Sequence, residues 1–235
     1  MPNLEWTHDL TAAGGLANIT LYRMVAENLD HKDPRIVADK LLVIGRVYSA
    51  AVTRGAGKRS ELDPHLPKSL YLHLAERMVG AHRQLDRQVT QLRQIQRIEV
   101  QSVASVVECH SFLASVLIDG INEWRSTNSD RDVQARDSFI SKYLHFHAPM
   151  AFFILDSLAR TALKANGMRN WRVRWPNDFG TELRTPYASF CFRMLSYIDL
   201  SYLGPWWTPR MVDGHLLGYL PSEAFDGARR NQQHP

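Results

Sequence analysis

The sequence contains few of the residues that build metal sites or covalently stapled folds. Its 235 residues include two cysteines, Cys109 and Cys191, which lie far apart along the chain. Two cysteines cannot by themselves hold an iron–sulfur cluster or a structural zinc ion, and no HExxH-type histidine pair is present. Reduced thiols are typical of the cytoplasm. We therefore expect a cytoplasmic protein that uses no metal and no other cofactor.

Long apolar runs and targeting signals are also missing. No run of about 18 uncharged apolar residues occurs, which argues against a transmembrane helix. Residues 1–6 carry neither a basic segment nor an apolar one, so we expect no secretory signal and no membrane partner. The apolar share of 45% is still enough for a globular core.

What is present is a helical spacing of apolar residues along almost the whole chain. It predicts helices over about 34–51, 67–80, 82–98, 100–124, 133–147, 155–165, 186–197 and 210–219. The pairs Asp33-Pro34 and Thr208-Pro209 are typical helix starts, and Asn166-Gly167 is a typical helix end. No alternating strand pattern and no internal repeat interrupts this spacing.

These features predict an all-α fold, a compact bundle of about eight to ten helices. We expect one domain over residues 1–223, with an N-terminal half, 1–125, and a catalytic half, 131–223. A polar tail, 224–235, follows it. Nothing in the pattern indicates an obligate oligomer, so we expect a monomer.

The net charge of +4 is unevenly distributed. Positive and negative residues cancel over residues 1–130, and the whole excess lies in 131–235. A run without any acidic residue contains Arg160, Lys164, Arg169, Arg172 and Arg174, with Trp171 and Trp175 interleaved. Basic residues mixed with aromatic ones suit a polyanion whose bases can stack, so nucleic acid is the expected partner. A solvated helix end followed by a basic loop is the simpler alternative.

Ionisable residues cluster in an otherwise apolar segment before this basic run. Lys142 and His145 are three residues apart, and Tyr143 and His147 four apart, so each pair shares one helix face. Asp156 follows a proline break and starts the next helix, where the helix dipole stabilises a carboxylate. Asp156 is either a simple helix cap or a carboxylate held against apolar surface for chemistry.

The order of these residues resembles the helix–hairpin–helix DNA glycosylase superfamily. Ser141-Lys142, an apolar helix end, a proline and an apolar run into Asp156 look most like the divergent bacterial 8-oxoguanine-DNA-glycosylase-like proteins. The segments 187–191 and 210–216 resemble the late helices of these proteins, and 42–48 an early one. The turn before Ser141 has no glycine and the interval from lysine to aspartate is short, so the hairpin is degenerate.

The resemblance implies a DNA glycosylase fold and activity. The enzyme would flip a modified base out of duplex DNA, cut its N-glycosidic bond and leave an abasic site, in base-excision repair or in defence against phage with modified bases. Asp156 would stabilise the developing sugar cation, and Lys142 would attack C1′ if the enzyme also has lyase activity. The side chains expected to line the base pocket or bind DNA are Tyr143, His145, His147, Phe152, Arg160, Lys164, Arg169, Trp171, Arg172, Arg174 and Trp175.

Two other classes of protein remain open. Arg77 and His82 have the spacing of the arginine and histidine of helical toxin-type or defence-type ribonucleases. A non-catalytic nucleic-acid-binding helical protein would need no active site at all. In that case, Asp156 would only cap its helix.

Overall fold

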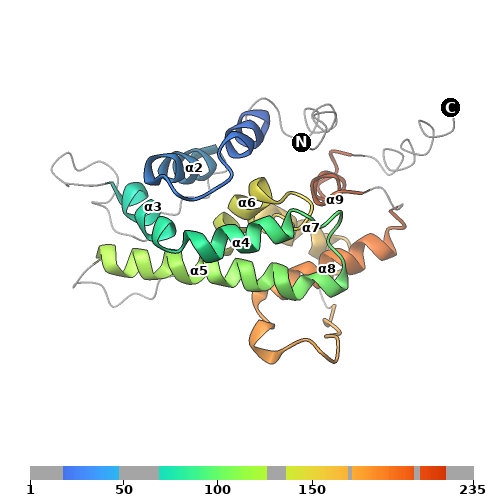
Figure 1. Cartoon of the computed structure of the whole chain (residues 1–235). Helices are drawn as coiled ribbons and strands as arrows, with labels where there is room; N and C mark the ends of the chain where they lie inside the picture. Colours follow the sequence, from blue (N-terminus) through green and yellow to red (C-terminus); the bar gives the residue numbers. More distant parts are fainter. Residues whose placement is uncertain (1–17, 48–68, 126–135, 169–170, 204–206, 221–235) are drawn as a thin grey trace, which may run out of the picture.

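The computed structural model describes residues 18–47, 69–125, 136–168, 171–203 and 207–220. These residues form helices and no strand, which confirms the predicted all-α class. After a helix over 18–27 come α2 (Pro34–Val47), α3 (Leu70–Gly80), α4 (His82–Leu92), the 3₁₀ helix η2 (Val100–Ser102), α5 (Val103–Arg125), α6 (Asp137–His147), α7 (Ser157–Ala165), the 3₁₀ helix η4 (Thr181–Leu183), α8 (Pro186–Leu200) and α9 (Pro209–Leu216) (Figure 1). The expected tail, 224–235, lies outside the described residues.

Side-chain caps start several of these helices. Thr185 and Thr208 each accept a hydrogen bond from a backbone amide of the first turn, at 3.1 Å in both cases, with a proline as the next residue. Such caps satisfy amides that have no partner within the helix. Glycine ends another helix: after the last turn of α7, Gly167 has φ +83°, a left-handed conformation that glycine adopts without strain.

The structure corrects several helix boundaries. α3 begins at Leu70, because Ser69 is extended and caps it, so the predicted start at Pro67 is wrong. α4 ends at Leu92 rather than at 98, and α6 begins at Asp137 rather than at 133. The helix over 18–27 was not predicted.

The long helix α5 runs along one side of the bundle and contacts α3, α4, α6 and α8 (Figure 1). Its buried face includes Val106, Leu113, Leu117 and Ile121. By length and composition alone, Val100–Trp124 could cross a membrane, unlike the expectation from the sequence. In this bundle its apolar face instead packs against four other helices.

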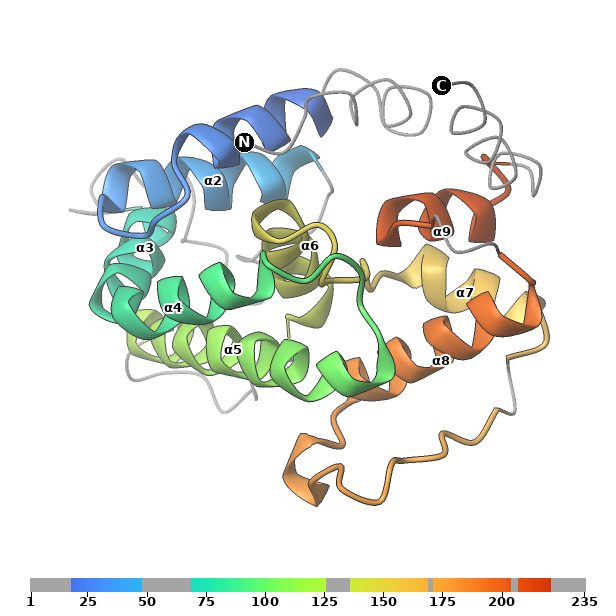
Figure 2. The same ribbon diagram turned by 45° about the vertical axis from the view of Figure 1, so that its right-hand side comes forward.

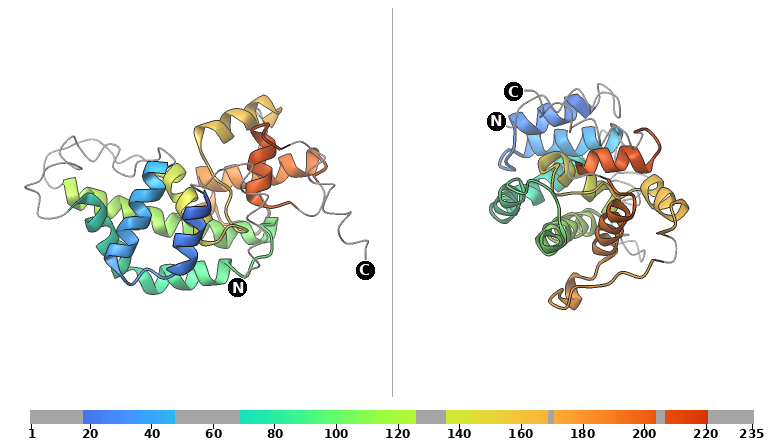
Figure 3. Two further views of the ribbon diagram at one scale, coloured as in Figure 1. Left: turned by 90° about the horizontal axis from the view of Figure 1, so that it is seen from above. Right: turned by 90° about the vertical axis from the view of Figure 1, so that its right-hand side faces the viewer.

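The short helix α6 lies between two groups of helices. The first group is the 18–27 helix with α2 to α5, and the second is α7 to α9. Figure 2 shows the helices before it on one side, and α7, α8 and α9 on the other. The view from above in Figure 3 shows the same separation. Every residue of α6 from Phe139 to His147 is buried, and one hydrophobic cluster includes side chains from both halves of the chain. The polar residues of α6 are therefore held in the interior between the two groups.

The close approach of α3 and α5 depends on Gly120. A Cβ added there would lie 2.8 Å from Leu74 Cδ2 and 3.2 Å from Arg77 Cγ. We predict that Gly120→Val lowers the free energy of unfolding by about 1–3 kcal/mol, because it overpacks this contact. Gly80→Val is the matched control, since a Cβ there meets no atom within 4 Å. Urea denaturation of both variants measures the difference, and equal stabilities would contradict the prediction.

Candidate functional site

Lys142 and Asp156 meet at the junction of α6 and α7. Lys142 Nζ lies 3.3 Å from Asp156 Oδ2 and 3.3 Å from Ser138 Oγ. The lysine side chain is 4% exposed and the aspartate side chain 23% exposed. A buried ammonium is costly without a negative partner, and this carboxylate supplies one. The pair therefore places a carboxylate that solvent can reach against a cation that it cannot.

The two oxygens of Asp156 have different partners. Oδ1 accepts a 2.9 Å hydrogen bond from Ala159 N, so Asp156 is the N-cap of α7. Oδ2 faces Lys142. The capping interpretation of Asp156 is thus correct, but it accounts for only one of its oxygens.

Helix α9 adds a second ion pair to this junction. Arg210 Nη1 lies 2.7 Å from Asp213 Oδ2, and both side chains are largely buried. Burial raises the pKa of Asp213 to about 6; the charge of Arg210 lowers it, that of Asp156 raises it and that of Lys142 lowers it. Two acids and two bases from α6, α7 and α9 thus form one electrostatic cluster.

His145 is on the same side of α6 and is neutral. Its Nδ1 lies 2.8 Å from the carbonyl oxygen of Phe152, and its Nε2 lies 2.6 Å from the Tyr22 hydroxyl. Because a carbonyl only accepts, Nδ1 carries the proton and Nε2 accepts from Tyr22. Burial, together with a smaller effect of the nearby Arg210 charge, lowers the pKa of His145 to about 4. This histidine links α6 to the 18–27 helix and to the segment 152–156, which leads into α7.

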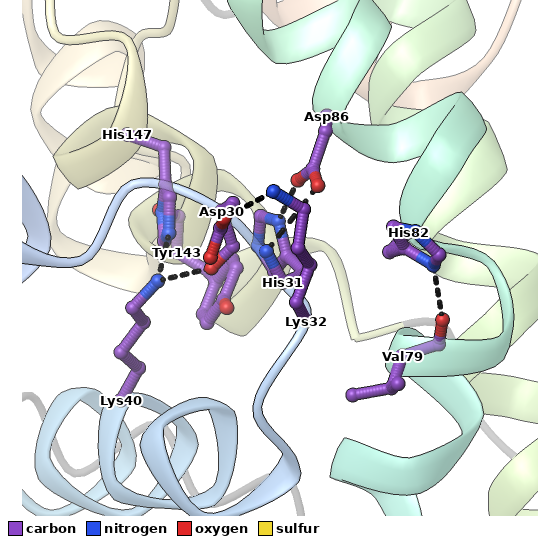
Figure 4. A network of polar contacts seen from close by, with 9 residues as sticks. All are labelled: Asp30, His31, Lys32, Lys40, Val79, His82, Asp86, Tyr143 and His147. Carbon is purple, nitrogen blue, oxygen red and sulfur yellow. Dashed lines mark hydrogen bonds and ion pairs between the residues drawn. The ribbon is translucent and has the colours of Figure 1, made fainter.

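Tyr143 and His147 lie on the other side of α6, in a separate polar cluster (Figure 4). Their rings stack 4.4 Å apart, which confirms that the two residues share a helix face. His147 Nδ1 donates to the Tyr143 carbonyl oxygen at 2.8 Å, so its Nε2 accepts from Lys40 Nζ at 3.3 Å. Lys40 is fully buried, and burial lowers its pKa to about 8.

A third ring of this cluster comes from the segment before α2. His31 stacks on His147 with ring centroids 5.0 Å apart, and its Nδ1 lies 2.5 Å from Asp86 Oδ1 on α4. Lys40 also donates to the Asp30 carbonyl oxygen at 3.2 Å. The cluster therefore ties together α2, α4 and α6 (Figure 4).

The four side chains from α6 and the segment after it that were expected to line the base pocket or bind DNA are all buried. Tyr143, His145 and Phe152 are 0% exposed and His147 is 1% exposed. In this structure each of them contacts the protein interior, so none lies on the surface where DNA would bind. Their assignment to the base pocket or to DNA binding stays a prediction, and the sequence pattern could not show that all four are buried.

The predicted basic run is split into two parts. Arg160 and Lys164 are exposed on α7, four residues apart and four and eight residues from Asp156, so they continue its face of the helix. Arg172, Arg174 and Trp171 are exposed on the segment that loops out beyond α8, on the side away from α9 (Figures 1 and 2). Arg169 lies outside the described residues.

Trp175 is less available for stacking on a base than its sequence position indicates. It stacks on Phe179 at 5.3 Å, meets Phe192 edge-on at 5.4 Å and lies beneath the guanidinium of Arg184. This aromatic cluster anchors the looped segment to α8. Trp171, by contrast, remains 36% exposed.

The ribonuclease candidates are not brought together. α3 ends at Gly80 and α4 begins at His82, so Arg77 and His82 belong to different helices. Arg77 forms an ion pair with Glu123 at 3.2 Å, and His82 Nδ1 donates to the Val79 carbonyl oxygen at 2.7 Å (Figure 4). The turn between α3 and α4 separates the two residues, so they do not lie on one helix as the family spacing requires.

The sequence pattern missed Arg210 and Asp213 as members of the site. They lie more than fifty residues beyond Asp156, and the only signal was the Thr208-Pro209 helix start two residues before Arg210. Within the described ranges, no group of three or more histidine, cysteine or acidic side chains is arranged to hold a metal ion.

Comparison with known proteins adds no relative. No protein-family model matches the chain, and no curated protein or solved structure matches it at a significant level. The resemblance to DNA glycosylases therefore stays a prediction.

The buried histidines predict a loss of stability in acid. Burial lowers the pKa of His145 to about 4 and that of His110 to about 3, so the unfolded chain, whose histidines titrate near 6.5, takes up protons first as the pH falls. Stability is fully present above pH 6.5 and is lost on the way down to pH 4, with roughly 3 kcal/mol from His145 alone. Denaturation across this range measures it. His145→Gln is expected to flatten the dependence of the free energy of unfolding on pH. Tyr22→Phe should flatten it in part, because the Tyr22 hydroxyl can donate only to the neutral imidazole. The same pH dependence in His145→Gln and the wild type would contradict the assignment.

Proposed function

We propose that the protein is a DNA glycosylase that releases a modified base from DNA and leaves an abasic site. The observation that carries this proposal is the partly exposed Asp156 carboxylate paired at 3.3 Å with the buried Lys142 ammonium. Its reaction needs no cofactor. The expected setting, in repair or in defence against phage with modified bases, belongs to the proposal as well.

The chemistry fits this pair. Breaking an N-glycosidic bond builds positive charge on the sugar, and a nearby carboxylate lowers the barrier by stabilising that charge. One oxygen of Asp156 is fixed by the helix amide and the other by Lys142, so the carboxylate is held in place before the reaction. A prepositioned charge loses little energy to reorganisation when the transition state forms.

A surface for the DNA backbone adjoins the same carboxylate. Arg160 and Lys164 extend from Asp156 along α7 and are exposed. They place positive charge next to the site, where phosphates on either side of a flipped nucleotide would pass. Arg172, Arg174 and Trp171 form a second basic area on the looped segment, which would bind a more distant part of the duplex.

Asp156→Asn separates the catalytic role from the capping role, because asparagine caps helices as well as aspartate does but carries no charge. We predict that it lowers base release by about 10²- to 10³-fold. Its thermal stability should also fall, because the buried Lys142 ammonium loses its negative partner, so base release is compared below the melting temperature of the variant. The measurement is release of modified bases from duplex DNA, followed by alkali cleavage of the abasic strand.

The matched control is Asp33→Asn. Asp33 caps α2 through a 2.8 Å hydrogen bond to Arg35 N, and α2 belongs to the other group of helices. This variant should keep full activity. Base release by Asp156→Asn equal to that of Asp33→Asn would show that Asp156 is only a cap, and RNA cleavage in place of base release would favour a nuclease.

Lys142 is tested by trapping. If its amine attacks C1′, borohydride reduction should join the protein covalently to DNA, and Lys142→Gln should abolish that adduct. An active wild-type enzyme that forms no adduct is monofunctional, with Lys142 holding Asp156 in place.

The α7 cations are predicted to carry the backbone contact nearest the site. The double variant Arg160→Gln/Lys164→Gln should weaken DNA binding and reduce the salt dependence of log Kd by about 1–2 units of slope, since two phosphate contacts are lost. Arg83→Gln/Arg87→Gln, two exposed arginines of α4, is the control of equal charge change. Fluorescence anisotropy at several salt concentrations gives the slopes, and equal slopes for the two double variants would remove α7 from the DNA surface.

A further inference from the structure

A second carboxylate, Asp213, is buried on a helix that packs against α7. It is in the middle of that helix, α9. Its side chain is 7% exposed and pairs with Arg210 one turn earlier, with Arg210 Nη1 2.7 Å from Oδ2. A buried ion pair is often no more stabilising than apolar residues of the same volume. Stability alone therefore does not explain why the buried pair Arg210–Asp213 occurs at this junction.

The charges of both Lys142 and Asp156 affect the pKa of Asp213. Burial raises its pKa to about 6, and besides Arg210 the charges that act on it are those of Asp156 and Lys142. Electrostatic interaction is mutual, so the charge on Asp213 also acts on Asp156 and on Lys142. The groups at this junction are Lys142 and neutral His145 from α6, Asp156 from α7, and Arg210 and Asp213 from α9. A further pair, Arg160 of α7 and Asp137 of α6, lies 4.0 Å apart, and its two charges cancel.

We propose that Asp213 is a positioning residue of this site, whose ionisation removes the excess positive charge that Lys142 and Arg210 leave around Asp156. The proposal rests on the glycosylase function argued above, and it adds a residue from α9 that regulates the site by its charge.

Counting the charges shows the effect. With Asp213 protonated, Lys142 and Arg210 outnumber Asp156, and the cluster carries one net positive charge. With Asp213 ionised, the cluster is neutral. A site with excess positive charge opposes a sugar cation, so base release is favoured once Asp213 has lost its proton.

The direction of the pH dependence follows. Because Asp213 titrates near pH 6, base release should rise as the pH increases through about 6 and then level off. Asp213→Asn, which keeps the shape and removes the charge, should lose this rise and stay near the low-pH rate of the wild type, roughly tenfold below its plateau at pH 8. Single-turnover base release from pH 5 to 8 measures both profiles.

Arg210→Gln tests the same proposal without touching the carboxylate, in case Asp213→Asn does not fold. Losing the cation 2.7 Å from Asp213 should move the rise in activity to higher pH by roughly one unit. Asp199→Asn, an exposed acid at the end of α8, is the control and should keep the wild-type profile.

A second measurement needs no activity. In protein labelled with ¹³C at the aspartate carboxyl carbons, the resonance lost in Asp213→Asn identifies Asp213, and its titration is followed by NMR. Its midpoint should move up in Lys142→Met, which loses a cation, and down in Asp156→Asn, which loses an anion.

The two measurements distinguish the failures. If the wild type releases no base but the Asp213 midpoint moves in these opposite directions, the glycosylase proposal fails and the charge coupling is supported. A midpoint that moves in neither variant overturns the coupling. Base release whose rise near pH 6 persists in Asp213→Asn, or does not move in Arg210→Gln, overturns the role of Asp213 in the reaction.

Discussion

The structure depends on one constraint: α6 is buried on all sides, yet it carries polar and ionisable side chains. Burying an unpaired charge is costly, so the ionisable groups of α6 need partners inside the protein. The Tyr143 hydroxyl is the exception among the polar groups of α6, because it is buried with no hydrogen-bond partner. Lys142 meets Asp156, His145 meets Tyr22 and the Phe152 carbonyl oxygen, and His147 meets Lys40. These partners come from helices on both sides of α6, so the pairing itself holds the two groups of helices together.

The two sides of α6 have different characters. On the Lys40 side, stacked rings and a fully buried lysine join α2, α4 and α6, and Asp86 reaches solvent at 21% exposure. The Lys142 side reaches solvent through Asp156, which is 23% exposed at the start of α7. Only the Lys142 side combines a partly exposed carboxylate with a second buried ion pair, Arg210–Asp213, and this combination makes the junction of α6, α7 and α9 the candidate site.

That junction combines features that a glycosylase would need, and each comes from a different element. α6 supplies a buried cation, the start of α7 a fixed carboxylate and then exposed bases, and α9 a second carboxylate with its own arginine. A helix cap alone would require neither the buried lysine nor the second ion pair. Lys142, Arg210 and Asp213 are not needed for the hydrogen bond from Ala159 N to Asp156 Oδ1.

The sequence by itself determined the all-α class, most of the helices and the pairing of faces on α6, because these depend on spacing and on local capping residues. The helix starts at Pro186 and Pro209, the glycine after α7 and the Tyr143–His147 stack follow from such local rules. Only the tertiary structure decided that Tyr143 and His147 face the core, that Arg77 and His82 are on separate helices, and that Arg210 and Asp213 join Lys142 and Asp156. Burial and long-range contacts depend on how helices distant in the sequence pack together, and a local pattern of residues contains no record of which helix covers which face.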